Sequence, residues 1–310
     1  MSKQRRIAMP RLPWIRFLCL GFVGLLCSLG CQGSAKGPVP IRIDVSGSST
    51  LAPLVAEAAK RFEAAHPNFR VEVQTGGSSR GIRDVRAGLV DLGMSSRLLK
   101  ETELEGVECH TIAWDGVAFV VHEDNPVNSL SDQQLREIYT GKLTNWRQVG
   151  GRDAPIVVSN RAEGRSELSL VGDHLGIQPV DFKADLVDGE TQQSIKTIVN
   201  NAHAIGYTSI GAAQHARDAG EPLKLLPLGG VEATTESVRS GKFPLARPLI
   251  VLRAAAGTAA QSAKDEFLAY LESSSVDDIA SSLGYVPPRR DREPATARLT
   301  GGKPGHRDGG

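Results

Sequence analysis

The chain has 310 residues, and its 36 Lys and Arg nearly balance its 35 Asp and Glu, which leaves a formal net charge of +1. This balance excludes the large positive excess that nucleic-acid binding usually requires, so no nucleic-acid partner is expected. The sequence contains neither a C-x-x-C pair nor an H-E-x-x-H motif, and we therefore expect no metal and no cofactor.

The first thirty residues have the composition of an export signal. Lys3, Arg5 and Arg6 open a positive segment, and the apolar run FLCLGFVGLLCSLG follows at 17–30. This run is shorter than the roughly 20 residues that span a membrane. The stretch SLGC resembles a bacterial lipobox, with Ser28 in place of the usual aliphatic residue. We expect a signal peptide over 1–30, a lipid on Cys31 and a lipid-anchored linker over 31–39. An ordinary signal peptide and an uncleaved anchor are the alternatives.

Strands and helices alternate in the first half of the remaining chain. IRIDV (41–45), FRVEVQ (69–74) and VDLGM (90–94) are typical of strands. An amphipathic helix is predicted after the first of them, and a shorter helix is predicted over about 80–87. The apolar face of the first helix contains Leu51, Leu54, Val55, Ala58 and Phe62. This order predicts a parallel sheet with helices on its faces.

The second half continues the alternation. GVAFVVHEDNP (116–126) indicates a buried strand, and SDQQLREIY indicates a helix with Ser131 as its N-cap. Further strands are predicted at 154–160, 204–210, 222–228 and 248–254, and a last helix at about 259–273. The order predicts an α/β fold of two lobes joined near 116–123 and 245–252. We place lobe 1 at 40–120 plus 248–287, lobe 2 at 121–247, and a disordered tail rich in Pro, Gly and charge at 288–310.

Hydroxyl side chains follow three successive predicted strands. They are Ser48-Ser49-Thr50, Ser78-Ser79 and Ser95-Ser96. Two of these clusters begin helices, whose free N–H groups favour anions, and strand ends of this kind form the ligand crevice of open α/β sheets. We favour one shared anion site over three independent helix caps. Arg161, after a buried strand, is placed to add a permanent charge, although a surface arginine on a loop is the alternative.

The second of these clusters also matches a catalytic motif. Gly77-Ser78-Ser79-Arg80-Gly81 reads G-x-S-x-G, the nucleophile elbow of serine hydrolases. Ser79 would be the nucleophile, and His203 or His215 follows in the order that a triad needs. No oxyanion-hole motif of the HGGG type precedes it, and a chance match is unsurprising in a chain with 33 glycines. We therefore favour anion binding and keep the hydrolase as an alternative of a different class.

Several stretches together resemble the substrate-binding lipoproteins of phosphate ABC transporters. They are GSSTLAPL (47–54), GGSSRGI (76–82), VDLGMSSR (90–97), the long stretch from DGVAFVV to RQVGG (115–151), AIGYTSIG (204–211), SGKFPLARPL (240–249) and GYVP (284–287). The resemblance covers roughly residues 40 to 287. It implies the two-lobed periplasmic-binding-protein fold of type II, in which each lobe is a mostly parallel sheet flanked by helices.

The resemblance also implies a phosphate site. The family's contacts fall on Thr50, on the backbone N–H of Leu51 with Ser49 adjacent, on Ser78 and on Arg161. Two departures affect the remaining contacts. Ser96 stands where many members have an Asp that accepts the proton of hydrogen phosphate. Gly164-Arg165-Ser166-Glu167 stands where they read G-S-G-T, so Arg165 and Ser166 join the expected site, and Glu167 either replaces the lost Asp or pairs with an arginine.

A non-enzymatic binding protein is the function that the resemblance implies. Such a protein is exported to the cell envelope or periplasm, anchored to the membrane by lipid, and monomeric. It captures inorganic phosphate between its lobes for the permease subunits of an ABC transporter. Because of the two departures, sulfate, molybdate or a role in ligand sensing remain alternatives, as does a structural lipoprotein that has lost its ligand.

Overall fold

The computed structural model describes residues 39–255 and 262–288. Met1–Val39 form one unit of the chain and Pro40–Gly310 a second, to which all the helices and strands below belong. The expected signal peptide, Cys31 and nearly all of the expected C-terminal tail lie outside the described residues. No helix in the described ranges is both long and apolar enough to cross a bilayer.

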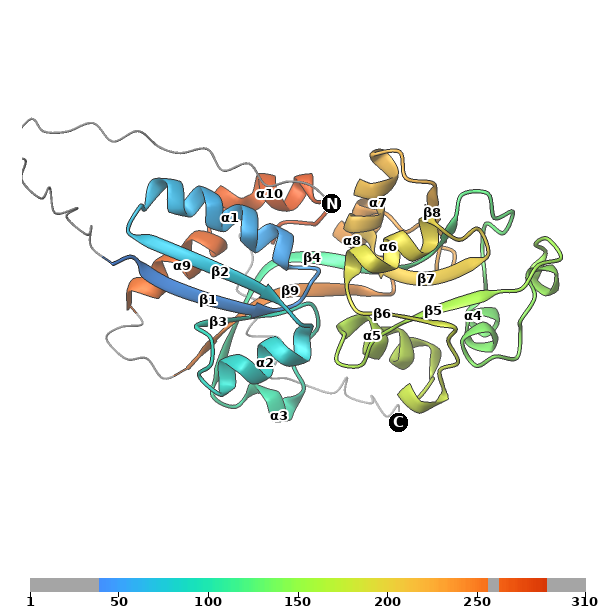
Figure 1. Ribbon diagram of the computed structural model, residues 1–310, viewed down its shortest axis with the longest axis horizontal. Helices are drawn as coiled ribbons and strands as arrows, with labels where there is room; N and C mark the ends of the chain where they lie inside the picture. Colours follow the sequence, from blue (N-terminus) through green and yellow to red (C-terminus); the bar gives the residue numbers. More distant parts are fainter. Residues whose placement is uncertain (1–38, 256–261, 289–310) are drawn as a thin grey trace, which may run out of the picture. The chain divides into compact units, whose positions relative to one another are not determined.

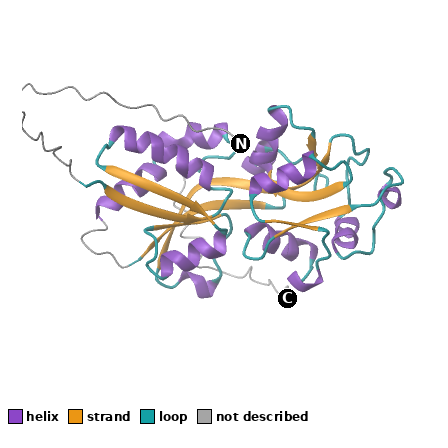
Figure 2. Ribbon diagram, in the orientation of Figure 1, coloured by secondary structure: helices purple, strands orange, loops and turns teal. Residues whose placement is uncertain are grey.

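One lobe is built on three parallel strands in the order β2-β1-β3. They are β1 (Ile41–Gly47), β2 (Phe69–Thr75) and β3 (Leu92–Ser95). The expected amphipathic helix is α1 (Ala52–Ala65), and its predicted apolar face is buried against the sheet. Helices lie on both sides of these strands in Figure 2. The other helices of this lobe are α2 (Ser78–Arg86), α3 (Glu101–Leu104), α9 (Ser262–Glu272) and α10 (Asp277–Ser282).

Two long antiparallel strands continue from this lobe into the other (Figure 1). They are β4 (Val107–His122) and β9 (Ala246–Ala254), and β9 also pairs antiparallel with β3. β4 begins well before the apolar run at 116, because its first half pairs with β9. Ile112 and Ala113 pack in the core of the first lobe, whereas the residues from Val117 to Phe119 pack in the core of the second. The passage between lobes therefore lies within these strands.

The second lobe combines parallel and antiparallel pairing. β7 (Ala204–Ser209) and β8 (Leu223–Leu225) pair antiparallel with β4, while β5 (Val157–Arg161) pairs in parallel with β7 and with β6 (Leu186–Asp188). Ser131 caps the first helix of the lobe by accepting from the N–H of Gln134, as predicted. The helices are α4 (Asp132–Tyr139), α5 (Ser166–Leu175), α6 (Thr191–Val199), α7 (Ile210–Asp218) and α8 (Thr235–Arg239).

Mixed α/β lobes with helices on both sides of the sheet confirm the predicted fold class. The antiparallel strand β9 between β3 and β4 makes the sheet less purely parallel than the alternation of elements suggested.

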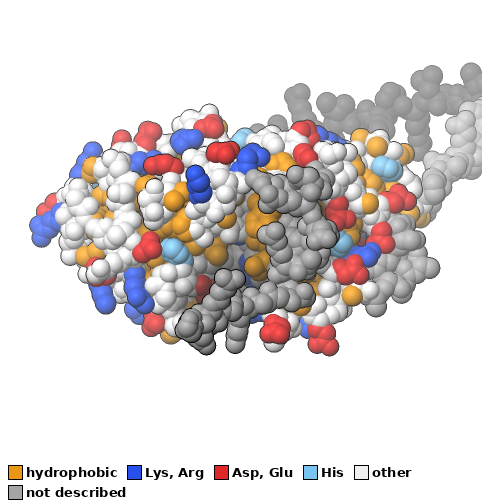
Figure 3. Space-filling model, turned by 180° about the vertical axis from the view of Figure 1, so that it is seen from behind, with side chains coloured by type: hydrophobic (Ala, Val, Ile, Leu, Met, Phe, Trp, Pro, Cys, Tyr) orange, Lys and Arg blue, Asp and Glu red, His pale blue; other side chains and the backbone are white. Residues whose placement is uncertain are grey.

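On the face seen in Figure 3, basic and acidic side chains are intermingled, in agreement with the near-zero net charge.

Gly47 allows the backbone to turn closely past β3 before the first hydroxyl cluster. Its φ is 137°, and a Cβ there would lie 2.2 Å from the carbonyl oxygen of Met94. We expect Gly47→Ala to lower the free energy of unfolding by about 2–4 kcal/mol in urea titrations, since it adds a backbone clash to an unfavourable φ. Gly88→Ala is the control, because Gly88 has a φ of 67° and open space around it. Equal losses in the two variants would contradict this explanation.

Candidate functional site

The three hydroxyl clusters predicted from the sequence meet in the structure. Ser48 Oγ donates to Ser96 Oγ at 2.9 Å, and Ser78 Oγ lies 3.4 Å from the same atom. Ser78 also accepts from the backbone N–H of Ser96 at 3.0 Å. All three side chains are buried. The ends of β1 and β3 and the start of α2 therefore converge on one point of the first lobe.

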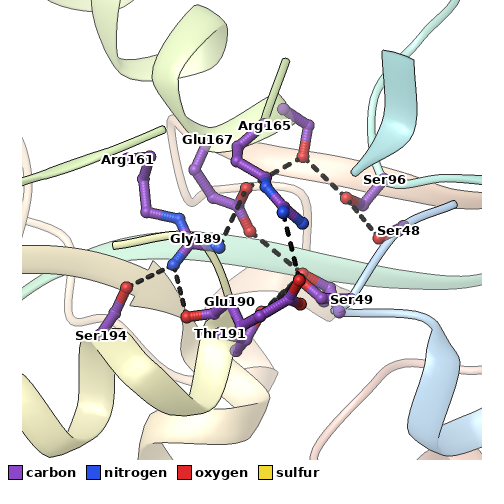
Figure 4. A network of polar contacts seen from close by, with 12 residues as sticks. Ser48, Ser49, Ser96, Arg161, Arg165, Glu167, Gly189, Glu190, Thr191 and Ser194 are labelled. Atoms are coloured by element: carbon purple, nitrogen blue, oxygen red, sulfur yellow. Dashed lines mark hydrogen bonds and ion pairs between the residues drawn. The ribbon is translucent and has the colours of Figure 1, made fainter. Parts of the chain in front are cut away.

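The second lobe brings its own hydroxyl groups to this point (Figure 4). Ser166 begins α5, and its Oγ lies 2.7 Å from Ser96 Oγ. Thr191 begins α6, and its Oγ1 lies 3.2 Å from Ser49 Oγ and 3.4 Å from Thr50 Oγ1. The first turns of both helices thus face the hydroxyl clusters across the two lobes, and free N–H groups at helix starts favour anions.

Arg247 is a site residue that the sequence analysis missed. It lies on β9 with its side chain 1% exposed, directly opposite Asp115 on β4, and the two form an ion pair at 3.0 Å. Its Nη1 donates to Ser166 at 2.9 Å and its Nη2 donates to Thr50 at 3.1 Å. The signal in the sequence was a charged residue in the otherwise apolar strand ARPLIVL, because a buried charge requires partners.

Arg161 is buried, so the alternative of a surface arginine is wrong. It ends β5 and is 2% exposed. Its Nη1 donates to the carbonyl oxygen of Glu190 at 2.8 Å and to Ser194 Oγ. Its Nε and Nη2 have no hydrogen-bond partner among the described residues, although Nη2 lies 3.8 Å from the Glu167 carboxylate. A buried guanidinium with two unused donors is suited to bind an anion.

The other predicted contacts have partners within the protein. The N–H of Leu51 donates to Ser48 Oγ at 3.3 Å. Arg165 pairs with Glu190 at 3.1 Å, and Thr75 of the first lobe donates to the same Glu190 oxygen at 3.4 Å. Arg165 Nη1 is a further buried donor with no partner among the described residues. The structure thus gathers the predicted site residues around the junction of the lobes.

Glu167 lies at the centre of these donors. Its Oε1 accepts from Thr50 at 3.1 Å and from Arg247 at 3.2 Å, and its Oε2 accepts from Ser166 at 3.2 Å. Burial opposes ionisation of this carboxyl, but the charges of Arg247 and Arg161 outweigh burial and lower its pKa to about 2. Glu167 is therefore a carboxylate at neutral pH. Of the two roles that the sequence allowed, replacing the lost Asp or pairing with an arginine, the structure shows the pairing with arginine.

Ser79 does not have the surroundings of a hydrolase nucleophile. It is half-buried in the first turn of α2, and its backbone N–H donates to the carbonyl oxygen of Gly164 at 3.4 Å. His203 and His215 are both exposed. Within the part of the chain that the structure describes, no hydrogen bond joins Ser79 Oγ to a histidine or a carboxylate. The G-x-S-x-G match therefore has no general base beside it here.

Comparison with known proteins identifies relatives that bind phosphate according to their names. A model of the PBP superfamily domain matches residues 33–275. The phosphate-binding protein PstS of Bacillus subtilis is 31% identical over 266 residues, covering 82% of this chain and 84% of that protein. The chain belongs to the PstS family. The PstS of Borreliella burgdorferi is 26% identical over 79% of this chain and 89% of its own length.

Solved structures of related binding proteins share the fold. A phosphate ABC transporter substrate-binding protein of Clostridium perfringens, solved with bound phosphate, has a TM-score of 0.73 and 29% identity, covering 80% of this chain and all of its own. An ABC-type phosphate transport receptor of Vibrio cholerae has a TM-score of 0.66 and 30% identity, covering 79% of this chain and all of its own.

The low pKa of Glu167 predicts a pH-dependent contribution to stability. A carboxyl whose pKa falls from its usual 4.5 to about 2 on folding stabilises the native state above pH 4.5 and loses this contribution as the pH falls through 2. We expect wild type to exceed Glu167→Gln in free energy of unfolding at pH 7, and the difference to shrink by about 3 kcal/mol towards pH 2. Urea titrations of both proteins from pH 7 to pH 2 measure this. A difference that does not change with pH would contradict the assignment.

Proposed function

We propose that this protein captures inorganic phosphate at the junction of its two lobes and delivers it to an ABC transporter. The observation that supports this most directly is Arg161, a buried guanidinium with two donors unused by the protein. Glu167, which lies 3.8 Å from Arg161, accepts from the hydroxyls of Thr50 and Ser166, and the hydroxyls of Ser96 and Ser78 continue from Ser166. The relatives are named as phosphate-binding proteins. Guanidinium and hydroxyl donors around a helix start are the groups that bind tetrahedral oxyanions in proteins.

The mechanism needs no chemical step. Two lobes joined by the strands β4 and β9 allow closure on an ion, since a ligand that contacts both lobes favours the closed arrangement. The ligand residues come from both lobes, with Ser49, Thr50, Leu51, Ser78 and Ser96 in the first and Arg161, Arg165 and Ser166 in the second. The protein acts as a monomer that presents the loaded site to permease subunits.

Export and anchoring complete the proposal. A transporter that imports phosphate needs its binding protein on the outer side of the membrane, in the cell envelope or periplasm. The lipobox-like stretch ending at Cys31 would hold it there by a lipid.

The phosphate site can be tested by substitution of Arg161. We expect Arg161→Ala to weaken phosphate binding about 30-fold to a few thousandfold in calorimetric titrations, because losing a buried charge partner costs about 2–5 kcal/mol. Arg83→Ala is the matched control, since Arg83 lies on α2 with a side chain 70% exposed. Circular dichroism verifies folding of each variant.

Two results would contradict the proposed binding site. One is phosphate affinity that is unchanged in Arg161→Ala. The other is ester hydrolysis by wild type that Ser79→Ala abolishes, which would favour the hydrolase instead.

Anchoring can be tested separately in cells. We expect Cys31→Ala to move the mature protein from the membrane fraction to the soluble fraction while its phosphate affinity stays unchanged, because Cys31 precedes the folded unit that starts at Pro40. Mass spectrometry of the wild-type N-terminus detects the lipid. Membrane retention of the variant, together with an unmodified wild-type Cys31, would exclude the anchor.

A further inference from the structure

The Glu167 carboxylate uses the donors that an oxyanion would need. Thr50 and Ser166, both predicted ligands, donate to its two oxygens at 3.1 and 3.2 Å, and Arg247 donates at 3.2 Å. Arg161 Nη2 lies 3.8 Å from Glu167 Oε2. Figure 4 shows the carboxylate between the serines of the first lobe and the guanidinium of Arg161. A carboxylate of the protein therefore lies in the position expected for the ion.

The buried charges at this point are balanced by the protein alone. Arg161 and Arg247 carry two positive charges, and Asp115 and Glu167 face them at 3.0 to 3.8 Å with two carboxylates. All four side chains are buried. Phosphate at neutral pH adds one to two negative charges, and like charges repel strongly where water is excluded. The ion and the carboxylate of Glu167 thus compete for the same positive field.

Glu167 also joins the two lobes directly. The hydrogen bond that Thr50 donates to Glu167 links the loop before α1 in the first lobe to α5 of the second lobe. The contacts between Ser96 and Ser166 and between Ser49 and Thr191 lie beside it. A ligand changes a conformational equilibrium only by its differential affinity for the two states. A contact within the protein that already stabilises the closed arrangement therefore lowers the free energy that the ion can contribute by favouring closure.

We propose that Glu167 is a built-in competitor of the anion: it takes the ion's place between the lobes and must leave Thr50, Ser166 and Arg247 before the ion binds. This inference rests on the proposed function, because it concerns the same site. Only molecules in which Glu167 has left these donors can bind the ion, so the apparent affinity falls in proportion to the fraction of such molecules. The site consequently reaches half-saturation at a higher phosphate concentration than in a relative with threonine at this position of the motif.

Calorimetric titration with inorganic phosphate tests the competition. We expect Glu167→Gln and Glu167→Thr each to bind phosphate at least tenfold more tightly than wild type, since both remove the competing charge. Glu167→Thr restores the residue of the family motif, so it provides a second folded variant if the amide is not tolerated. Glu163→Gln is the matched control, because Glu163 is an exposed carboxylate on the same loop, and its affinity should equal that of wild type.

Affinity that is unchanged or weaker in both Glu167 variants would overturn the inference. So would weaker phosphate binding together with new sulfate binding, because that result would make Glu167 the acceptor of the phosphate proton.

Solution scattering without phosphate gives a readout that does not depend on the proposed function. We expect a larger radius of gyration for ion-free Glu167→Thr than for ion-free wild type, because the variant loses a contact that closes the lobes. Equal radii would overturn the inference. Absence of phosphate binding by wild type and by both variants would instead refute the proposed function, and the scattering comparison would still decide the role of Glu167.

Discussion

The buried guanidinium of Arg247 is the interaction on which the arrangement of the site depends. It lies where β4 and β9 pass from one lobe to the other, paired across the two strands with Asp115. Burying a charge at this depth is costly unless it is paired and hydrogen-bonded, and the ion pair with Asp115 offsets that cost. Its remaining donors reach Thr50 of the first lobe and Ser166 of the second. The junction of the lobes and the anion site are therefore organised by the same side chain.

Arg161 has the complementary property. Arg247 uses its donors within the protein, whereas Arg161 keeps Nε and Nη2 without hydrogen bonds among the described residues. One arginine thus fixes the geometry, and the other remains available to a ligand. The pKa of Asp115 is raised by burial and lowered by Arg247, with burial the larger effect, while the Glu167 pKa falls because two guanidinium groups act on it. The Glu167 carboxylate therefore lies within ion-pair distance of both arginines.

Local patterns in the sequence predicted every strand except β6 and the helices α1, α2, α4 and α9, but they did not indicate α3, α6, α7, α8 or α10. The face of α1 formed by Leu54, Val55 and Ala58 and the cap at Ser131 depend on residues a few positions apart, so spacing alone indicates them. The meeting of Ser48, Ser78 and Ser96 followed from strand ends that share one edge of a sheet. Arg247 could not be chosen in this way. Its importance depends on the register between β4 and β9, which pairs residues far apart in the chain, and spacing carries no information about that register.

A crystal structure of the protein grown with phosphate tests the central claim most directly. The account predicts a phosphate ion between the lobes within hydrogen-bond distance of Arg161 Nε and Nη2, with the Glu167 carboxylate moved away from Thr50 and Ser166. Arg247 should keep its pair with Asp115. A phosphate-saturated crystal in which Glu167 stays on Thr50 and no ion contacts Arg161 would contradict the account.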